Sequence, residues 1–258
     1  MFWGDPANLR HPHRAQGRIG VGQAGYRGCA CATCRADRGI RDRFGPIDAL
    51  LVSGDLSNDG SAESFTRLKS LIAPLHMPLC LVSRNHDACD VMRATYDKNL
   101  PDIGALNRPR QIGGFQLIGL DTLVEGQGGG TLSPETLAFL QSALAKADGG
   151  PVLLVLHHPP FACGIRFIDD IGLTNRDALG EVLTDYSSAL RLVCGHIHSM
   201  IVSDVAGHIA LSAPSPCSTF AHDRRPDAPV GYMTQEDGCL LHRWDSGFQS
   251  IRIGPVAG

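Results

Sequence analysis

Four apolar segments of this chain each end in a cluster of polar residues, and this repeated arrangement constrains the fold more than any other feature. The segments cover residues 47–53, 79–82, 152–156 and 190–194, and each has the length and composition of a strand buried on both faces. Because the ends of strands in open α/β sheets converge on one crevice, we expect the polar clusters to meet in space. These clusters are, in chain order, Gly54-Asp55, Asn85-His86-Asp87, His157-His158 and Gly195-His196-Ile197-His198.

The other patterns from residue 41 onward favour an α/β domain over residues 41–258. Helical spacing of apolar residues predicts helices over 64–73, 133–149 and 177–183. Strands and helices alternate first and strands alone follow, which predicts an α/β core with added antiparallel strands. The further strands that we expect cover residues 115–120, 201–205, 209–211 and 239–244.

Residues 1–40 differ in composition from the rest of the chain. They contain only six Leu, Ile, Val, Met or Phe residues, and six Arg against two Asp. We therefore expect an atypical, poorly ordered segment without a packed element. A small zinc module is an alternative, but the spacing of its candidate ligands is irregular for a zinc site. These ligands would be Cys29, Cys31 and Cys34 with His11 or His13.

Charge and hydropathy exclude several classes of protein. The formal net charge of −3 argues against a nucleic-acid polymer as partner. No apolar run reaches the roughly 18 residues of a membrane span, and the N-terminus lacks the pattern of a signal peptide. Nine cysteines, an odd number, favour reduced thiols and a cytoplasmic protein. The sequence leaves open whether copies of the chain assemble into a homo-oligomer.

The side chains of the four clusters form a ligand set for a divalent metal ion. Together they offer a carboxylate, an amide oxygen and several imidazoles, which suit Zn, Mn, Fe or Co better than Ca. His196 and His198 alternate, so on an extended segment both point to the same face. Gly54 and Gly195 allow the backbone to approach an ion closely. Taken singly, each cluster also has an ordinary explanation as a turn or a buried, hydrogen-bonded histidine.

The order of the clusters, together with three short motifs, carries a resemblance to a known family. The motifs are Leu120-Asp121-Thr122, Pro159-Pro160-Phe161 and Ile171-Gly172-Leu173. The pattern resembles the calcineurin-like metallophosphoesterase superfamily, and within it the bacterial cyclic-nucleotide and glycerophosphodiester phosphodiesterases. The resemblance covers about residues 44–245. It implies a four-layer αββα sandwich, with two β-sheets face to face, helices outside and two metal ions at one edge.

The resemblance implies metal ligands at five positions of this chain. Asp55 would bridge two divalent metal ions, whose identity is Mn, Fe, Zn or Co. His198 would bind the first ion. Asn85, His157 and His196 would complete the coordination of the second ion.

The activity that the resemblance implies is hydrolysis of a small-molecule phosphodiester, either a cyclic nucleotide or a glycerophosphodiester. A metal-bound hydroxide would attack phosphorus in line while the ions absorb charge on the phosphoryl oxygens. His86 would be the catalytic residue that stabilises the transition state or protonates the leaving alkoxide, and Asp87 would orient it. His158 matches a position that commonly points away from the metals.

Two loops are expected to rim this site, at residues 121–131 and 161–175. In the second loop, three apolar side chains could pack a base or another apolar leaving group, or could belong to ordinary loop packing. These side chains are Phe161, Ile165 and Phe167.

Two departures from the family pattern put activity in doubt. Arg84 stands where the family usually has glycine before Asn-His-Asp, and its side chain would crowd the site. The family also opens with a strand that ends in Asp-x-His, and residues 1–46 contain no such motif. The first ion would then keep only Asp55 and His198. The alternative is therefore a catalytically impaired scaffold or binding protein of the same fold.

A shifted reading frame would explain the missing motif. Asn8-Leu9-Arg10-His11-Pro12-His13 can be encoded as AAT CTC CGA CAC CCA CAT, followed by C. Read one nucleotide later, the same string encodes Ile-Ser-Asp-Thr-His-Ile, which contains Asp-x-His. We therefore hypothesise that one segment of the chain is a frameshifted form of a normal family N-terminus. The segment would begin at about residues 1–7 and end at about residues 35–39.

Overall fold

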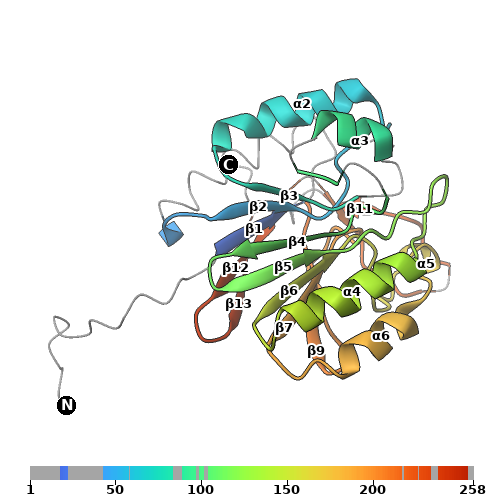
Figure 1. The fold of residues 1–258 in the computed structure, drawn as a ribbon. Helices are drawn as coiled ribbons and strands as arrows, with labels where there is room; N and C mark the ends of the chain where they lie inside the picture. The colour runs from blue at the N-terminus through green and yellow to red at the C-terminus, as the bar shows by residue number, and fades with distance from the viewer. Residues whose placement is uncertain are drawn as a thin grey trace, which may run out of the picture.

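The computed structural model describes residues 18–22, 43–57, 59–83, 89–96, 99–101, 104–216, 218–225, 227–233 and 238–254, and the statements below concern these residues. They form two β-sheets that pack face to face, with helices on both outer faces (Figure 1). This is the four-layer αββα arrangement that the resemblance implied. In the described part of the chain, we find no helix long and apolar enough to cross a membrane.

One sheet has six strands in the order β4-β5-β6-β7-β9-β8. Its inner strands β5, β6, β7 and β9 run parallel to one another, while β4 and β8 at the two edges are antiparallel to their neighbours. Strands β6 and β7 have the bounds that the sequence predicted. The strands are β4 (Arg108–Ile112), β5 (Phe115–Gly119), β6 (Val152–Leu156), β7 (Leu190–Cys194), β8 (Val202–Val205) and β9 (His208–Ser212).

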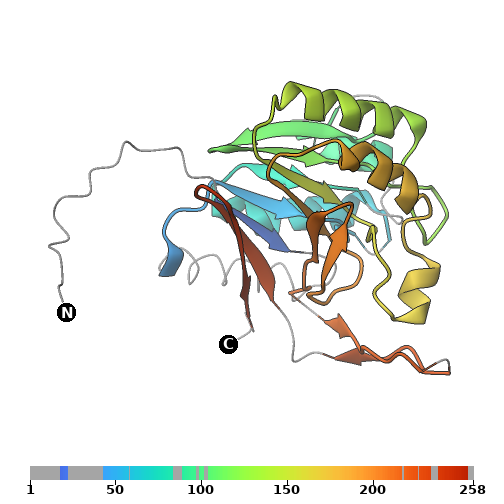
Figure 2. The same ribbon diagram turned by 90° about the horizontal axis from the view of Figure 1, so that it is seen from below.

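The other sheet has five strands in the order β13-β12-β1-β2-β3. Strands β1, β2 and β3 are parallel, and β12 and β13 are joined to them in antiparallel pairing. Its strands are β1 (Arg18–Gly22), β2 (Ala49–Val52), β3 (Leu79–Leu81), β12 (Cys239–Trp244) and β13 (Phe248–Ile253). A separate hairpin, formed by β10 (Thr219–Phe220) and β11 (Tyr232–Met233), lies outside both sheets (Figure 2).

Alternation along the strands separates the layers of the core. Leu51 of β2 packs with Leu153 of β6 in the cluster between the two sheets. Its neighbour Leu50 faces the opposite way and packs against Phe65 of a helix. In the same manner, Leu154 belongs to the cluster between the six-stranded sheet and its helices. The period of two in a strand therefore gives both sheets two apolar faces, as the continuous apolar runs predicted.

Five helices cover these outer faces in the described residues. The five-stranded sheet is covered by α2 (Ala62–Ile72) and α3 (Cys89–Thr95), and the six-stranded sheet by α4, α5 and α6. Ser133 begins α4 as predicted, because its side chain accepts a hydrogen bond from the backbone N–H of Thr136. The remaining bounds are α4 (Pro134–Lys146), α5 (Arg166–Asp170) and α6 (Arg176–Thr184).

Strand β1 contradicts the expectation that residues 1–40 contain no packed element. Its backbone pairs with β12 on one side and with β2 on the other, so it is an inner strand of the sheet. Composition missed it because Arg18–Gly22 contains two glycines and only two apolar side chains, while pairing depends on the neighbouring strands. Residues 1–17 and 23–42, with His11, His13 and Cys29 to Cys34, lie outside the described residues.

A partly buried chain of hydrogen bonds connects the two sheets. Arg191 of β7 donates a hydrogen bond from Nη1 to Ser250 Oγ at 2.7 Å. The Ser250 hydroxyl in turn lies 2.8 Å from Nδ1 of His242 in β12. The His242 side chain is fully buried, and burial together with the charge of Arg191 lowers its pKa to about 3. His242 is therefore neutral at ordinary pH, with Nδ1 hydrogen-bonded to the Ser250 hydroxyl.

This histidine makes stability depend on pH. Its folded pKa lies below its unfolded value, so as pH falls from about 6.5 toward 3 the unfolded chain binds a proton first and stability is lost. In that window, the free energy of unfolding of the wild type should fall more steeply with pH than that of the His242→Gln variant. The difference should be up to about 1.4 kcal/mol per pH unit. Urea unfolding at pH 7.5 and 5.0, with chelator present, measures the difference. His222→Gln, at an exposed position, is the control, and equal slopes in all three proteins would contradict the assignment.

Candidate metal centre

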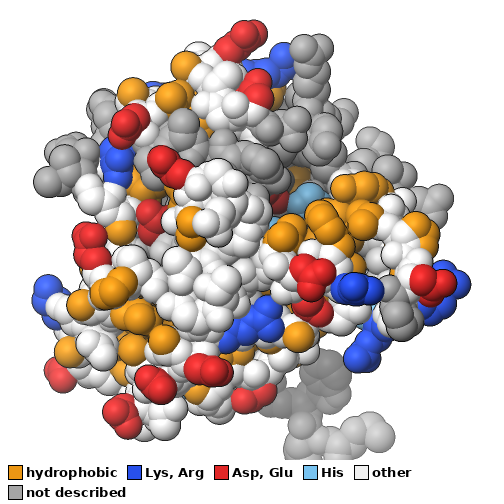
Figure 3. Space-filling view, turned by 90° about the vertical axis from the view of Figure 1, so that its right-hand side faces the viewer, with side chains coloured by type: hydrophobic (Ala, Val, Ile, Leu, Met, Phe, Trp, Pro, Cys, Tyr) orange, Lys and Arg blue, Asp and Glu red, His pale blue; other side chains and the backbone are white. Residues whose placement is uncertain are grey.

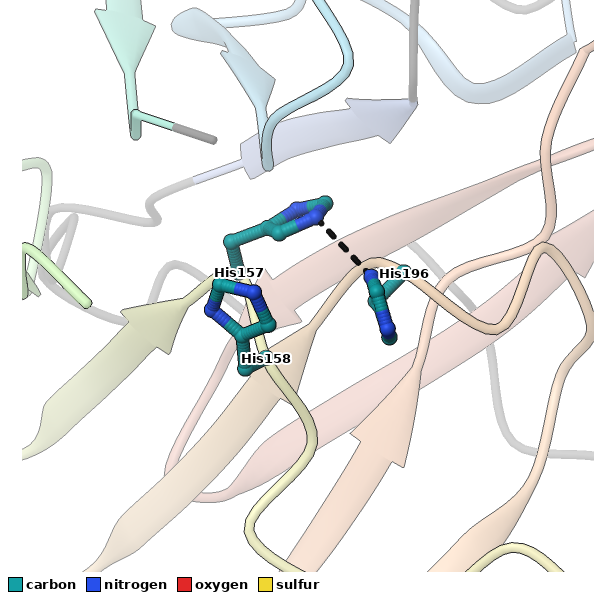
Figure 4. A group of neighbouring side chains, drawn as sticks. All are labelled: His157, His158 and His196. Atoms are coloured by element: carbon teal, nitrogen blue, oxygen red, sulfur yellow. Dashed lines mark hydrogen bonds between the residues drawn. The ribbon is translucent and has the colours of Figure 1, made fainter. Parts of the chain in front are cut away.

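Three of the four polar clusters meet at the carboxyl ends of β2, β6 and β7. Asp55 follows β2, His157 follows β6, and His196 and His198 follow β7. Asp55 Oδ2 lies 2.8 Å from Nε2 of His198, and its Oδ1 lies 3.8 Å from Nε2 of His157. Nδ1 of His196 is 3.2 Å from the same His157 nitrogen (Figure 4). The carboxylate therefore lies between two groups of imidazoles.

Backbone carbonyls fix the protonation of two of these rings. Nδ1 of His157 is 2.8 Å from the Ser53 carbonyl oxygen, and Nδ1 of His198 is 3.1 Å from that of Ser218. A carbonyl can only accept, so both Nδ1 atoms carry a proton, and Nε2 is the nitrogen of each ring that remains for a metal ion. At His198 this nitrogen lies 2.8 Å from Oδ2 of Asp55, a separation that needs either a proton or a shared metal ion to hold the two atoms together. The arrangement is one that a metal ion satisfies.

His158 has a different environment although it lies beside the other histidines. Possible ligand atoms of His157, His158 and His196 lie within 4.8 Å of one another (Figure 4). However, Nε2 of His158 lies 3.2 Å from the Gly128 carbonyl, and its Nδ1 lies 2.8 Å from Thr122 Oγ1. Nε2 therefore donates and Nδ1 accepts, which occupies both nitrogens with protein partners. His158 holds the 121–131 loop in place, and we leave it out of the ligand set.

Three residues of the site have strained backbones. Asp55, His196 and His198 have φ angles of 58°, 68° and 61°, in the left-handed region that non-glycine residues rarely adopt. Each such residue costs about 1 kcal/mol or more, and such strain is concentrated at functional sites. Two of these residues, Asp55 and His198, contact each other through their side chains, and His196 contacts His157.

Gly54 is required by contact as well as by conformation. Its φ is +106°, and a Cβ atom there would lie 2.0 Å from Nδ1 of His157. We expect Gly54→Ala to displace the His157 ring and weaken metal affinity by about 10- to 100-fold, measured by competition with a chelating dye. Gly126→Ala is the matched control, because Gly126 also has positive φ (+74°) but nothing within 4 Å of the added atom. Equal affinities in both variants would argue against this role of Gly54.

Asp121 joins the loop after β5 to the segment that follows β3. Its carboxylate accepts hydrogen bonds from Ser83 Oγ at 2.6 Å and from the backbone N–H of Leu106 at 2.8 Å and Leu123 at 3.0 Å. Ser83 directly precedes residues 84–88, which lie outside the described residues. This segment contains Arg84, Asn85, His86 and Asp87. Asp121 thus fixes the point from which the predicted catalytic segment starts.

The structure decides between the two alternatives for the apolar side chains of the second rim loop, and it favours ordinary packing for two of the three. Phe161 and Ile165 are 6% and 7% exposed and belong to the core between the six-stranded sheet and its helices. Only Phe167 is exposed, at 44%. Sequence patterns did not indicate Phe220, whose ring centroid lies 5.1 Å from that of His198. A single phenylalanine in a weakly patterned segment gives no such signal.

Comparison with known proteins agrees with this fold and site. The calcineurin-like phosphoesterase family model matches residues 31–200. A probable glycerophosphodiester phosphodiesterase of Arcobacter nitrofigilis is 30% identical over 200 residues, which cover 76% of this chain and 73% of the relative. A 3′,5′-cyclic adenosine monophosphate phosphodiesterase of Pseudomonas aeruginosa is 35% identical over 176 residues, covering 68% of this chain and 63% of the relative.

A solved structure supports the fold independently. The dimetal phosphatase from Danio rerio superimposes with a TM-score of 0.64 at 15% identity, covering 92% of this chain and 99% of the other. At that identity the likeness concerns the fold alone. The family match and the two bacterial relatives establish that the chain is a hydrolase that belongs to the calcineurin-like phosphoesterases.

Proposed function

We propose that this chain hydrolyses small-molecule phosphodiesters with the help of two divalent metal ions at Asp55 and the histidines around it. The observation that carries the proposal is the position of the Asp55 carboxylate, whose two oxygens face His198 on one side and His157 on the other. A carboxylate in this position suits a ligand shared by two ions. The names of the two bacterial relatives support a cyclic nucleotide or a glycerophosphodiester as the substrate.

The distances between the donor atoms fit bound ions. Metal–ligand bonds of about 2.0–2.2 Å in octahedral or tetrahedral geometry separate neighbouring ligand atoms by about 2.8–3.6 Å. His157 Nε2 and His196 Nδ1 are 3.2 Å apart, and His198 Nε2 and Asp55 Oδ2 are 2.8 Å apart. In this proposal His198 serves one ion and Asn85, His157 and His196 serve the other. Imidazole and carboxylate ligands favour Mn, Fe, Zn or Co over Ca.

The protein contributes orientation as well as ligands. Bound ions would lower the pKa of water and neutralise the charge on the phosphoryl oxygens. The Ser53 and Ser218 carbonyls hold the rings of His157 and His198 in the orientation and tautomer that ligation needs. Asp121 anchors Ser83, from which the segment with Asn85 and His86 begins.

His86 is the residue that we propose acts on the reacting phosphate. We expect His86→Ala to lower kcat by about 10²- to 10⁴-fold, because a positioned proton donor contributes that much, while metal affinity changes little. Parallel measurement of kcat and of metal content separates the two effects. An equal loss of both would make His86 a metal ligand instead.

Hydrolysis of bis-p-nitrophenyl phosphate, measured with and without added Mn²⁺, tests the proposal directly. We expect turnover that depends on the metal and that a chelator abolishes. Absence of turnover at every metal concentration would reject the hydrolytic proposal and support the second candidate below.

The second candidate is a catalytically impaired binding protein or scaffold of the same fold, and strand β1 favours it. Gly22, the last residue of β1, pairs with Val52, so β1 ends at the same edge as the strand that precedes Asp55. The sequence after Gly22 continues with Gln23-Ala24-Gly25, and residues 1–46 contain no Asp-x-His. The inner strand at this position thus brings no metal ligand directly after its end.

A further inference from the structure

A row of aromatic rings begins at His198 and is not used by the chemistry proposed above. The ring centroid of Phe220 in β10 lies 5.1 Å from that of His198. On its other sides, Phe220 lies 4.9 Å from Tyr232 of β11 and 6.3 Å from Phe167 of α5. Elements β10, β11 and α5 therefore form a row of aromatic rings, and Phe220 at its centre contacts one candidate metal ligand.

The row is fixed in position relative to His198. The Ser218 carbonyl accepts a hydrogen bond from Nδ1 of His198, and Thr219 Oγ1 donates to the His198 carbonyl at 3.1 Å. With the ring contact of Phe220, three successive residues hold the β10–β11 hairpin against this histidine. The hairpin, which lies outside both sheets in Figure 2, is thereby joined to the metal centre.

The outer rings of the row are open to solvent. Phe220 is only 9% exposed, but Phe167 is 44% and Tyr232 is 63% exposed. Phe220 is tilted by 40° to Tyr232 and by 52° to Phe167, so the rings do not cover one another by parallel stacking. Figure 3, which views the right-hand side of Figure 1, shows hydrophobic side chains gathered beside a histidine. Exposed aromatic surface next to a polar centre is typical of a ligand subsite.

From this arrangement we infer that Phe167 and Tyr232 bind the base of a nucleotide whose phosphate lies at Asp55 and His198. The inference rests on the proposed function and narrows its substrate class to nucleotides, with cyclic nucleotides preferred over glycerophosphodiesters. Purine and pyrimidine bases have flat π-faces that stack on aromatic side chains, whereas glycerol has none. The continuity of the row with His198 argues for a group attached to the bound phosphate.

Equilibrium binding to the full chain, with Mn²⁺ present, tests the inference without depending on turnover. Adenosine 5′-monophosphate and glycerol 3-phosphate are the two probes, since both carry a phosphate and only one carries a base. We expect the double variant Phe167→Ala/Tyr232→Ala to weaken binding of the nucleotide by about tenfold or more, and that of glycerol 3-phosphate by less than twofold. Tyr232→Phe should retain wild-type affinity. Val202→Ala, which truncates a side chain 60% exposed on an edge strand, is the control.

The outcomes separate this inference from the proposed function. If nucleotide binding is unchanged in the double variant, the aromatic subsite is rejected while phosphodiester hydrolysis stands. If the double variant keeps its nucleotide affinity but differs from the wild type in molar mass by sedimentation, the rings belong to an interface between two copies of the chain. The inference is then rejected. If the wild type binds neither probe, the proposed function fails and the subsite with it. Selective loss of nucleotide affinity supports both.

Discussion

Replacing Asp55 by asparagine should remove both metal ions and reduce phosphodiester hydrolysis on the order of 10³-fold. The neutral amide cannot bridge two cations, yet it has nearly the same shape as the carboxylate. In the metal-free protein an amide N–H can donate to Nε2 of His198, which now faces a carboxylate at 2.8 Å. We therefore expect the metal-free fold to be as stable as the wild type or more so. Metal content by mass spectrometry and thermal unfolding with chelator measure the two effects.

Asp177→Asn is the matched control for this prediction. Asp177 is exposed in the first turn of α6, away from the histidines, so its variant should keep the metal content and activity of the wild type. An Asp55→Asn protein that still binds two ions would remove the basis of the metal assignment. A metal-free Asp55→Asn protein that unfolds would show a structural role instead.

Restoring the family N-terminus should have the second largest effect. We propose that the natural reading of the gene over this segment yields a strand ending in Asp-x-His in place of residues 8–13. A protein translated from that frame up to residues 35–39 should hold the first of its two metal ions more tightly than the present chain does. It should also hydrolyse phosphodiesters about 100-fold faster, because the first ion gains two ligands.

Two controls make the reading-frame proposal testable. The restored protein with both new ligands replaced by alanine should return to the metal affinity of the present chain. The nucleotide sequence of the first 40 codons provides an independent check. DNA that cannot encode Ile-Ser-Asp-x-His in the next frame would contradict the proposal before any protein is made.

The sequence predicted best the strands that are buried on both faces. β6 and β7 begin and end where expected, because their apolar character is local and needs no partner to be recognised. β4 was missed since it is an edge strand with alternating exposure and a proline, Pro109. β1 is an inner strand and was missed for a different reason. Its place in the sheet depends on pairing with β2 and β12, and its own composition does not indicate a strand.

The candidate site was predicted in outline, and tertiary contacts decide its details. The pattern indicated that Asp55, His157, His196 and His198 should meet, and the structure brings them together. Which nitrogen of each ring carries a proton depends on carbonyl groups far away in sequence, such as Ser218. Only coordinates could supply the Ser218 contact and the ring next to His198. The predicted roles of Asn85 and His86 stay predictions, because both residues lie outside the described part of the chain.

The metal centre joins the two halves of the sandwich. Asp55 and the Ser53 carbonyl come from the five-stranded sheet, whereas the three imidazoles come from the six-stranded sheet. Bound ions would therefore cross-link the two sheets at the edge where the carboxyl ends of β2, β6 and β7 meet. Chelation should then accelerate amide hydrogen exchange at the carboxyl ends of β2, β6 and β7 while their opposite ends keep full protection. The cofactor would thus support the architecture as well as the reaction.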